Sequence, residues 1–321
     1  MDPLSVLQST ILQSSSTTNS SGGRLPVDWA AAIVLFFIAI FAVHFVRRAY
    51  RQPPRSGGTP VEVPGNVVKA FDLVERLFHW ALFMTLGLVM VSGIALYFPG
   101  SFNFILQAFG VAGTSAQDTA ANLLWHTDML WLLLGLIVIH VIWDLAVARS
   151  GKLILPYKSD VSDTWTRMIG FFGFGPKTQP RHGKYDAFMK LFHWGLVLCL
   201  VLLGVTGLYL WSPYGIMPSL SPSFENTLRL LHDIFAFLLV GLVAGHVYFA
   251  VLPVNWPVLR SIFTGTISGD AYNHDIDSSR WPLKKQKAPA PAPAPQTGPA
   301  PAMAAEPPMA DSDDNKELEV K

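Results

Sequence analysis

Five long apolar stretches alternate with shorter polar segments along this chain of 321 residues. A helix needs about 20 consecutive apolar residues to cross the hydrocarbon core of a membrane. The pattern therefore predicts membrane-spanning helices over residues 27–46, 76–98, 122–147, 186–211 and 227–252. We expect the first to be a retained helix rather than a cleaved leader, because no basic residue opens the chain and three arginines follow the stretch directly, namely Arg47, Arg48 and Arg51.

Composition agrees with a membrane protein. Hydrophobic residues make up 51% of the chain, charged residues 14%, and the mean hydropathy is +0.37, whereas average soluble chains carry about 25% charged residues. The net charge of +1 argues against a nucleic-acid binder. A single cysteine, Cys199, excludes an intrachain disulfide framework, an intrachain iron–sulfur cluster and a CxxCH haem attachment. Any redox centre must therefore use other ligands.

Basic residues are distributed unequally between the two sides of the predicted membrane. Of the 23 Lys and Arg residues, only Arg24 and Arg229 lie on one side, and the others lie in the segments 47–76 and 148–190 and in the C-terminal tail. Because Lys and Arg collect on the cytoplasmic side, we expect a multi-pass protein of the bacterial inner membrane with a periplasmic N-terminus and a cytoplasmic C-terminus.

These patterns divide the chain into six segments. From Ala288 an Ala/Pro repeat leads into an acidic run, a composition that cannot bury enough apolar surface to become ordered. The expected segments are a periplasmic stretch 1–26, an extra transmembrane helix 27–46, a cytoplasmic linker 47–74, a four-helix bundle 75–255, a cytoplasmic segment 256–287 and a disordered tail 288–321.

The four bundle helices contain an internal duplication. Leu77-Phe78-His79-Trp80 recurs 114 residues later as Leu191-Phe192-His193-Trp194, and Val91-Ser92-Gly93 recurs as Val205-Thr206-Gly207. At an offset of 106, the residues His126, Gly135, His140 and Val141 recur as His232, Gly241, His246 and Val247. The fold class predicted is an all-α integral membrane protein, with a four-helix bundle from a duplicated two-helix unit plus one extra N-terminal helix.

Six histidines lie within these helices, where an ionisable side chain is costly and marks a functional site. His126 and His140 are fourteen residues apart, as are His232 and His246, so each pair shares one helix face with a rise of about 21 Å between its members. The expected levels are an outer one with His126 and His232, and an inner one with His79, His140, His193 and His246.

Two imidazoles from facing helices at one depth form a bis-His axial site for haem iron. Closed tetrahedral zinc sites use four ligands, commonly including Cys or carboxylates, and the outer level offers only two His. Haem also carries propionates, and Arg76, Lys190 and Arg229 each stand three residues before a histidine of the set. Arg229 favours a propionate partner because it lies on the side poor in basic residues; for Arg76 and Lys190, ordinary cytoplasmic flanking charge explains the position equally well. Seven glycines either make room for a macrocycle or permit close helix packing, namely Gly87, Gly93, Gly135, Gly204, Gly207, Gly241 and Gly245.

Four regions, Glu75–Trp80, Leu124–Asp128, Gly183–Lys190 with Val205–Tyr214, and His232–His246, together resemble the cytochrome b (gamma) subunit of membrane-bound respiratory formate dehydrogenases, over about residues 69–282. The resemblance implies four transmembrane helices with two b-type haems and four axial ligands, His79, His126, His232 and His246. It pairs His126 with His232 for the outer haem and His79 with His246 for the inner haem.

The family takes electrons from an iron–sulfur subunit and reduces quinone beside the inner haem. Its loop before the third helix commonly reads Gly-Lys-Tyr-Asn, and here it reads Gly183-Lys184-Tyr185-Asp186. The resemblance makes these residues quinone-site candidates, and we add His193 from its position at the same membrane entry. Asp186 has two interpretations of equal weight: a proton relay for quinone reduction, or the cap of the following helix.

We therefore expect an electron-transfer subunit that anchors a formate dehydrogenase complex for formate respiration. Formate oxidation is not on this chain, since molybdenum or tungsten chemistry and iron–sulfur clusters belong to partner subunits; whether heterotrimers assemble further is left open. Alternatives are the cytochrome subunit of a hydrogenase or a thiosulfate or polysulfide reductase, a single-chain cytochrome of the b561 type, and a haem-free anchor or transporter. A third haem between His140 and His193 is a further hypothesis, which the family's four-ligand pattern disfavours.

Overall fold

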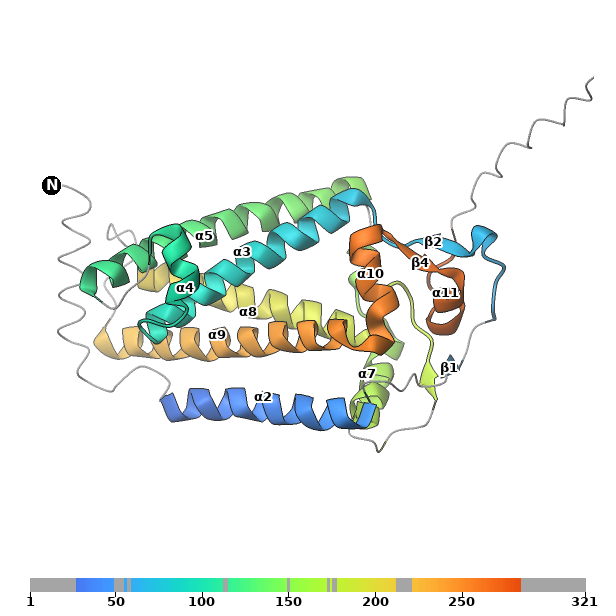
Figure 1. The fold of residues 1–321 in the computed structure, drawn as a ribbon, viewed down its shortest axis with the longest axis horizontal. Helices are drawn as coiled ribbons and strands as arrows, with labels where there is room; N and C mark the ends of the chain where they lie inside the picture. Colours follow the sequence, from blue (N-terminus) through green and yellow to red (C-terminus); the bar gives the residue numbers. More distant parts are fainter. Residues whose placement is uncertain are drawn as a thin grey trace, which may run out of the picture. The chain divides into compact units, whose positions relative to one another are not determined.

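The computed structural model describes residues 27–48, 55–56, 59–111, 115–148, 151–171, 174, 178–211 and 221–283. The expectations for residues 1–26 and 288–321 lie outside these residues. The helices are α2 (Val27–Arg48), α3 (Leu73–Tyr97), α4 (Asn103–Leu106), α5 (Ala116–Trp143), α6 (Gly151–Ile154), α7 (Lys158–Phe171), α8 (Ala187–Trp211), α9 (Pro222–Val251), α10 (Trp256–Thr264) and α11 (Gly269–Asp275) (Figure 1).

Four of these helices, α3, α5, α8 and α9, are long and apolar enough to cross a membrane, which confirms the predicted bundle spans. Helix α5 continues as a π-helix over Asp144–Ala148. The predicted extra helix is present as α2, in which the described apolar segment is Leu35–His44. We call the end of the bundle at which α3 and α8 begin the inner end, and the opposite end the outer end.

The duplication predicted from the sequence extends to the helix bounds and caps. Helices α3 and α8 begin and end at positions related by the offset of 114, and α5 and α9 begin at positions related by the offset of 106. Asp72 caps α3 by accepting the Glu75 N–H at 2.8 Å, and Asp186 caps α8 by accepting the Met189 N–H at 2.8 Å. The pairs are equivalent under the same offset, so Asp186 does cap α8, and its proton-relay interpretation stays a prediction.

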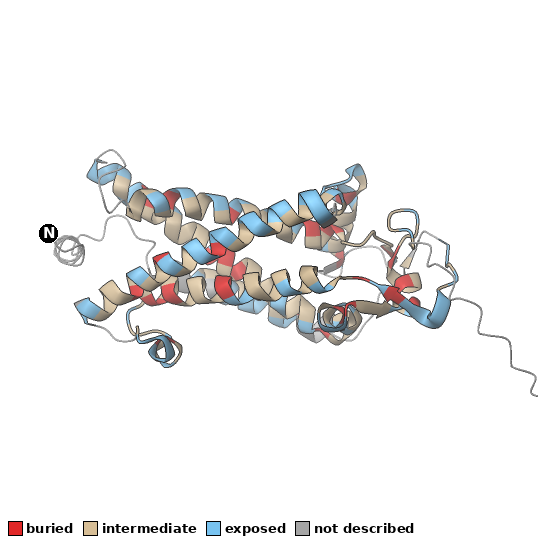
Figure 2. Ribbon diagram, turned by 90° about the horizontal axis from the view of Figure 1, so that it is seen from above, coloured by how far each residue is buried: buried red, intermediate tan, exposed pale blue. Residues whose placement is uncertain are grey.

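The helices pack as two pairs, α3 on α5 and α8 on α9, each pair being one copy of the repeated unit. A buried apolar layer at mid-depth takes one residue from each helix: Leu86, Leu133, Cys199 and Leu239. Leu133 lies midway between His126 and His140 along α5, and Leu239 midway between His232 and His246 along α9. This layer therefore separates the outer from the inner histidine level. Figure 2 shows the buried residues on the helix sides that face one another.

Helix α2 packs along α9. A Cβ atom added at Gly241 would lie 2.8 Å from Phe37 Cε2, and one at Gly245 would lie 3.1 Å from Phe41 Cζ. The Phe41 ring also stacks on Tyr248 with a centroid distance of 4.8 Å. The absence of a side chain at the two glycines thus allows α2 to approach, and of the two interpretations offered by the sequence, close helix packing holds here.

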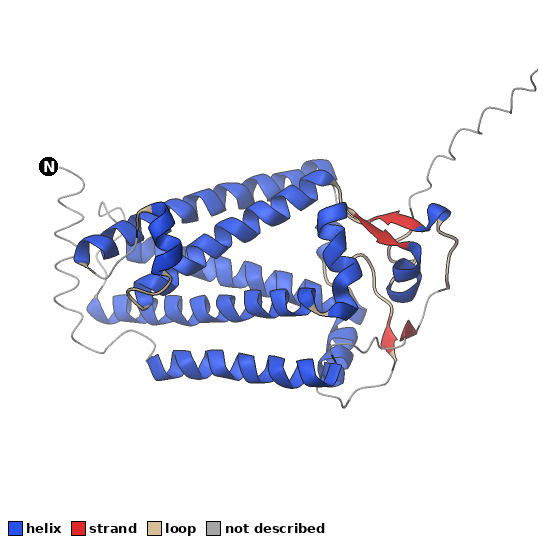
Figure 3. Ribbon diagram, in the orientation of Figure 1, coloured by secondary structure: helices blue, strands red, loops and turns tan. Residues whose placement is uncertain are grey.

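Short strands and helices cover the inner end of the bundle (Figure 3). Strand β2 (Val67–Lys69) pairs antiparallel with β4 (Thr266–Ser268), and β1 (Arg55–Ser56) pairs parallel with β3 (Gln179–Pro180). Buried Val68, Tyr272 and Ile276 form a second apolar cluster. The segments predicted as a linker and as a cytoplasmic segment are therefore folded against each other in the described residues. Two 3-10 helices, Pro64–Asn66 and Pro253–Asn255, lead into this region, and another, Gln107–Phe109, follows α4.

Candidate functional site

The outer histidines are held in the same way by the two copies of the repeat. Ser92 Oγ of α3 lies 2.9 Å from His126 Nδ1 of α5, and Thr206 Oγ1 of α8 lies 2.9 Å from His232 Nδ1 of α9. Ser92 is fully buried. His126 and His232 also interact electrostatically with each other. The site thus brings together two imidazoles from different repeats, each oriented by a hydroxyl on the neighbouring helix.

The hydroxyl groups determine which ring nitrogen is free. Ser92 Oγ donates to the Val89 carbonyl at 3.0 Å, and Thr206 Oγ1 donates to the Leu202 carbonyl at 2.7 Å. Each hydroxyl oxygen can therefore accept the Nδ1–H of its histidine, which leaves Nε2 with a lone pair. A hydrogen bond to the second ring nitrogen is the usual way in which proteins orient metal-binding histidines.

Two equivalent glycines lie against these rings. A Cβ atom at Gly93 would lie 3.2 Å from His126 Cε1, and a Cβ atom at Gly207 would lie 3.2 Å from His232 Cε1. Such a contact is tighter than an ordinary van der Waals distance, so the glycines make room for the rings. Gly87, Gly135 and Gly204 would meet nothing within 4 Å.

At the inner level His79 of α3 faces His246 of α9, with ring centroids 6.3 Å apart and planes tilted by 55°. A histidine nitrogen binds a metal ion at about 2 Å and the ring centre lies about 1 Å further out, so two imidazoles on opposite sides of one ion have centroids about 6 Å apart. The pair therefore fits bis-His ligation of one metal ion. The Phe192 ring stacks on His246 at 4.5 Å and limits its rotation.

Within the described residues, no group of three or more His, Cys, Asp or Glu side chains could hold a metal ion. Both levels offer pairs of imidazoles instead. The outer pair and the His79–His246 pair each offer two imidazoles, which would suit haem iron better than a four-ligand tetrahedral zinc site.

The cationic candidates differ in their surroundings. Arg229 pairs with Glu225 at 2.6 Å near the outer end and is about one-third exposed. Arg76 donates to the backbone carbonyls of Asp72 and Phe263. Lys190 is buried, pairs with Asp160 at 2.7 Å and lies over the Tyr157 ring. The ammonium group of Lys190 thus contacts Asp160 of α7 and Tyr157, the residue directly before α7.

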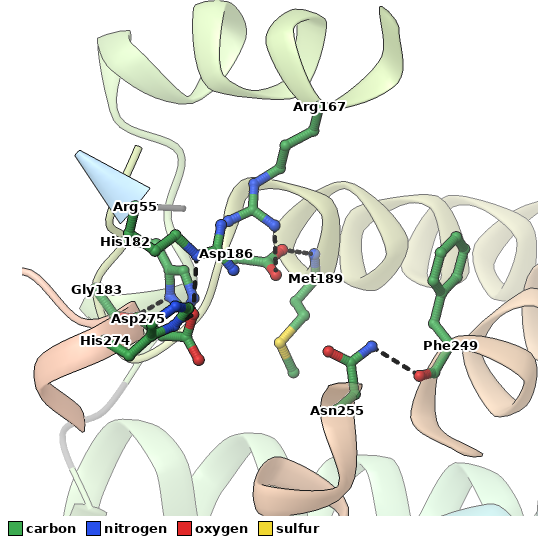
Figure 4. Close-up of polar contacts among 10 residues, drawn as sticks. All are labelled: Arg55, Arg167, His182, Gly183, Asp186, Met189, Phe249, Asn255, His274 and Asp275. Carbon is green, nitrogen blue, oxygen red and sulfur yellow. Dashed lines mark hydrogen bonds and ion pairs between the residues drawn. The ribbon is translucent and has the colours of Figure 1, made fainter. Parts of the chain in front are cut away.

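The candidate loop 183–186 lies in a network of partly buried charges at the inner end (Figure 4). Asp186 pairs with Arg167 at 3.2 Å, and Arg55 pairs with Asp275 at 2.8 Å. Burial alone would raise the pKa of the Asp186 carboxyl, but Arg167, His182, the Met189 N–H and Arg55 together hold that pKa below its ordinary value. The network thus favours the ionised form of the Asp186 carboxyl.

Lys184 and Tyr185 of the same loop interact with other titratable side chains. Lys184 pairs with Glu75 at 3.0 Å and lies 4.7 Å from the centre of the Phe71 ring. Burial raises the pKa of the Tyr185 hydroxyl, and the charges of Glu75, Asp144 and Asp72 raise it further. Gly183 lies against Arg280, and its carbonyl is 2.7 Å from His182 Nδ1.

The remaining two histidines also lie at the inner level, from the other two helices. His140 of α5 contacts the Phe78 ring edge-on at 5.4 Å, and His193 of α8 contacts Trp194 at 5.7 Å. The two histidines interact electrostatically. Sequence reasoning placed both correctly at this depth from helix length and direction alone.

Several residues of the site were not recognised from the sequence. The Val-Ser-Gly and Val-Thr-Gly match was noticed, but the role of Ser92 and Thr206 in holding the histidines was not. The Arg55–Asp275 pair joins residues 220 positions apart, a contact that no local pattern indicates.

Residues 70–265, which include all four bundle helices, match the family model described as prokaryotic cytochrome b561. The chain is 25% identical over 194 residues to the cytochrome b556(fdo) subunit of formate dehydrogenase from Escherichia coli strain K12, covering 58% of this chain and 80% of the relative. It is 26% identical over 176 residues to the formate dehydrogenase cytochrome b556 subunit of Haemophilus influenzae, covering 54% of this chain and 67% of the relative. For the nitrate-inducible cytochrome b556(Fdn) subunit of E. coli K12 the identity is 25% over 212 residues, covering 66% and 84%.

Proposed function

Because the chain belongs to the prokaryotic cytochrome b561 family, we propose that this multi-pass membrane cytochrome b carries two b-type haems and passes electrons from a formate dehydrogenase to membrane quinone. The observation that carries the proposal is the pair of equivalent contacts, Ser92 to His126 and Thr206 to His232, which present two Nε2 lone pairs from the two repeats at one level. When bound, haem supplies one-electron transfer.

The axial ligands proposed are His126 with His232 at the outer level and His79 with His246 at the inner level. The second pair is supported by its 6.3 Å centroid distance. The apolar layer of Leu86, Leu133, Cys199 and Leu239 separates the two levels and keeps water from the space between them.

Arg229 is the proposed partner of an outer propionate, since its guanidinium is accessible and stands one turn before His232. Arg76 stands one turn before His79 and is the corresponding inner candidate. Lys190 is not proposed, because its ammonium group is buried in its pair with Asp160, whereas Arg229 stays accessible in its pair with Glu225.

The partners proposed are an iron–sulfur subunit and a molybdenum- or tungsten-containing catalytic subunit, because the relatives named above are subunits of formate dehydrogenases. This chain has one cysteine and so relies on a partner for clusters. The proposed orientation places the outer end in the periplasm, with α2 as a fifth span and quinone bound at the inner end near residues 183–186 and His193.

The test is a visible spectrum of membranes containing the chain and its co-expressed partners, together with pyridine haemochrome quantification. Two haems per chain that are reduced by formate support the proposal. Haem reduced by hydrogen and not by formate would instead assign the chain to a hydrogenase, and the absence of haem would reject the cytochrome function.

A further inference from the structure

The duplication gives the two histidine levels different symmetries. His126 and His232 occupy equivalent positions of the two repeats. The duplication therefore exchanges the two members of the outer pair and produces no second outer pair. The inner pair is different: the equivalent of His79 is His193, and the equivalent of His246 is His140. The repeat therefore produces a second inner pair, contributed by α8 and α5, opposite the first.

The surroundings of this second pair repeat those of the first. Phe192 packs on His246, and its equivalent Phe78 packs on His140. The rings of Trp80 and His79 have centroids 5.7 Å apart and planes at 85°. Those of Trp194 and His193 have centroids 5.7 Å apart and planes at 86°. The two inner pairs thus have the same types of aromatic neighbour, although Phe192 stacks on His246 and Phe78 meets His140 edge-on.

Three features distinguish the second pair. The described ring contacts of His140 and His193 are with aromatic neighbours and not with each other, unlike those of His79 and His246. The His140 Nδ1 atom is buried and has no hydrogen-bond partner in the described part of the chain. One turn later on α5, the buried Trp143 Nε1 atom likewise lacks a partner there.

The chemistry at the end of α5 also departs from its counterpart. Trp143 and Asp144 stand where the other repeat has Phe249 and Ala250. Asp144 interacts electrostatically with His193 and with Tyr185, and the helix changes from α to π at this residue, a feature frequent at functional sites. One inner pair therefore has an apolar helix end beside it, and the other has an N–H donor and a carboxyl group.

We propose that His140 and His193 bind the headgroup of a membrane quinone, with Trp143 as an additional donor and Asp144 as the adjacent carboxyl group. A quinone carries carbonyl oxygens at opposite ends of a flat ring, and each can accept a hydrogen bond from a different side chain. The inference rests on the proposed function, in which a b-type haem is the electron donor. Conversion of one quinone to quinol takes two electrons from that donor and two protons, and His193 and Asp144 stand at the inner end, where protons enter.

Within this inner-end quinone region, Asp186 has a different role from Asp144. Asp186 already caps α8 and pairs with Arg167, and its counterpart Asp72 caps α3 without any pairing of that kind among the described residues. Asp186 thus holds the loop before α8, and we assign the carboxyl group at the quinone to Asp144 because of its electrostatic interaction with His193.

The experiment measures the affinity of the detergent-solubilised full chain for menadione and for decylubiquinone by equilibrium dialysis. The haem content of each preparation is measured alongside. We expect His140→Leu and His193→Leu each to weaken binding at least about tenfold, with wild-type haem content as proof of folding, and His140→Gln to restore part of the affinity because Gln keeps a donor. His274→Gln, outside the bundle helices, is the matched control.

Three results would overturn the proposal: unchanged affinity in both Leu variants, weaker binding in Asp186→Asn alone, or three haems in the wild-type chain that fall to two in the Leu variants. Failure of the proposed function is separate, because it appears as a wild-type chain without haem whatever the quinone affinity.

Discussion

The Oγ atom of Ser92 lies 2.9 Å from the Nδ1 atom of His126, and the hydroxyl is fully buried between the two helices. Thr206 repeats the contact with His232 at the same distance. A hydroxyl that donates to its own helix backbone and accepts from a histidine on the next helix fixes both the tautomer and the ring orientation.

Removing the hydroxyl at Thr206 tests this function. We expect Thr206→Val, which keeps the shape, to weaken haem retention about 10- to 100-fold, as loss of an outer hydrogen bond to a metal-binding His usually does. Dilution of the purified cytochrome followed by haem quantification measures the loss. Thr227→Val is the control, since Thr227 also bonds the carbonyl four residues earlier but is exposed and has no contact with a histidine among the described residues. Equal retention in the two variants would show that the hydroxyl does not support the ligand.

A methyl group beside the outer histidine gives a second test. Gly207→Ala places a Cβ atom 3.2 Å from His232 Cε1, so the ring must shift by a few tenths of an ångström. We expect a destabilisation of about 1–3 kcal/mol and a changed midpoint potential of one haem, measured by thermal unfolding and redox titration. Gly204→Ala, one turn earlier with nothing within 4 Å, should leave the midpoint potentials unchanged and should not destabilise the protein, because Ala favours the helix by up to about 1 kcal/mol. A shift of the same size in both variants would mean that the effect comes from the helix and not from the ring.

The bundle was predictable because its determinants repeat along the sequence. The stretch 186–211 became α8 (Ala187–Trp211), and the histidine depths followed from a fourteen-residue spacing that needs only the helix rise. The duplication identified equivalent residues before any contact was known. Periodicity and repetition are local properties, and they suffice to place side chains along a helix.

Contacts between distant segments were not predictable in this way. Lys190 was one of three cations considered for propionates, yet its buried ammonium group pairs with Asp160 on α7. The choice between packing and macrocycle space at Gly241 depended on Phe37 of α2, which sequence spacing does not place beside α9. Both outcomes depend on how separate elements dock.

Removal of one axial ligand tests the ligand assignment. We expect His232→Leu to lower the haem content from two per chain to one, because the outer pair loses a ligand while His79 and His246 keep their 6.3 Å arrangement. Pyridine haemochrome quantification measures the ratio. The comparison variant is His44→Leu, on α2, which should retain two haems because His44 bonds Tyr248 and belongs to neither proposed pair. Retention of two haems in His232→Leu would contradict the assignment.

A substitution at Asp186 separates a structural carboxylate from a proton carrier. Its pKa is held below the ordinary value, so the carboxylate contributes stability that is present above the unfolded-state pKa of about 3.9 and is lost as the pH falls toward the lower folded-state pKa.

In Asp186→Asn the cap bond to Met189 can remain, but Arg167 loses its partner. We expect a destabilisation of about 3 kcal/mol at pH 7 that shrinks as the pH falls below about 4, measured by thermal unfolding in detergent. Quinone reduction should keep the wild-type rate across pH while the haems stay reducible by the donor. A reduction rate that falls with this substitution at every pH, with stability unchanged, would establish the proton-relay role instead.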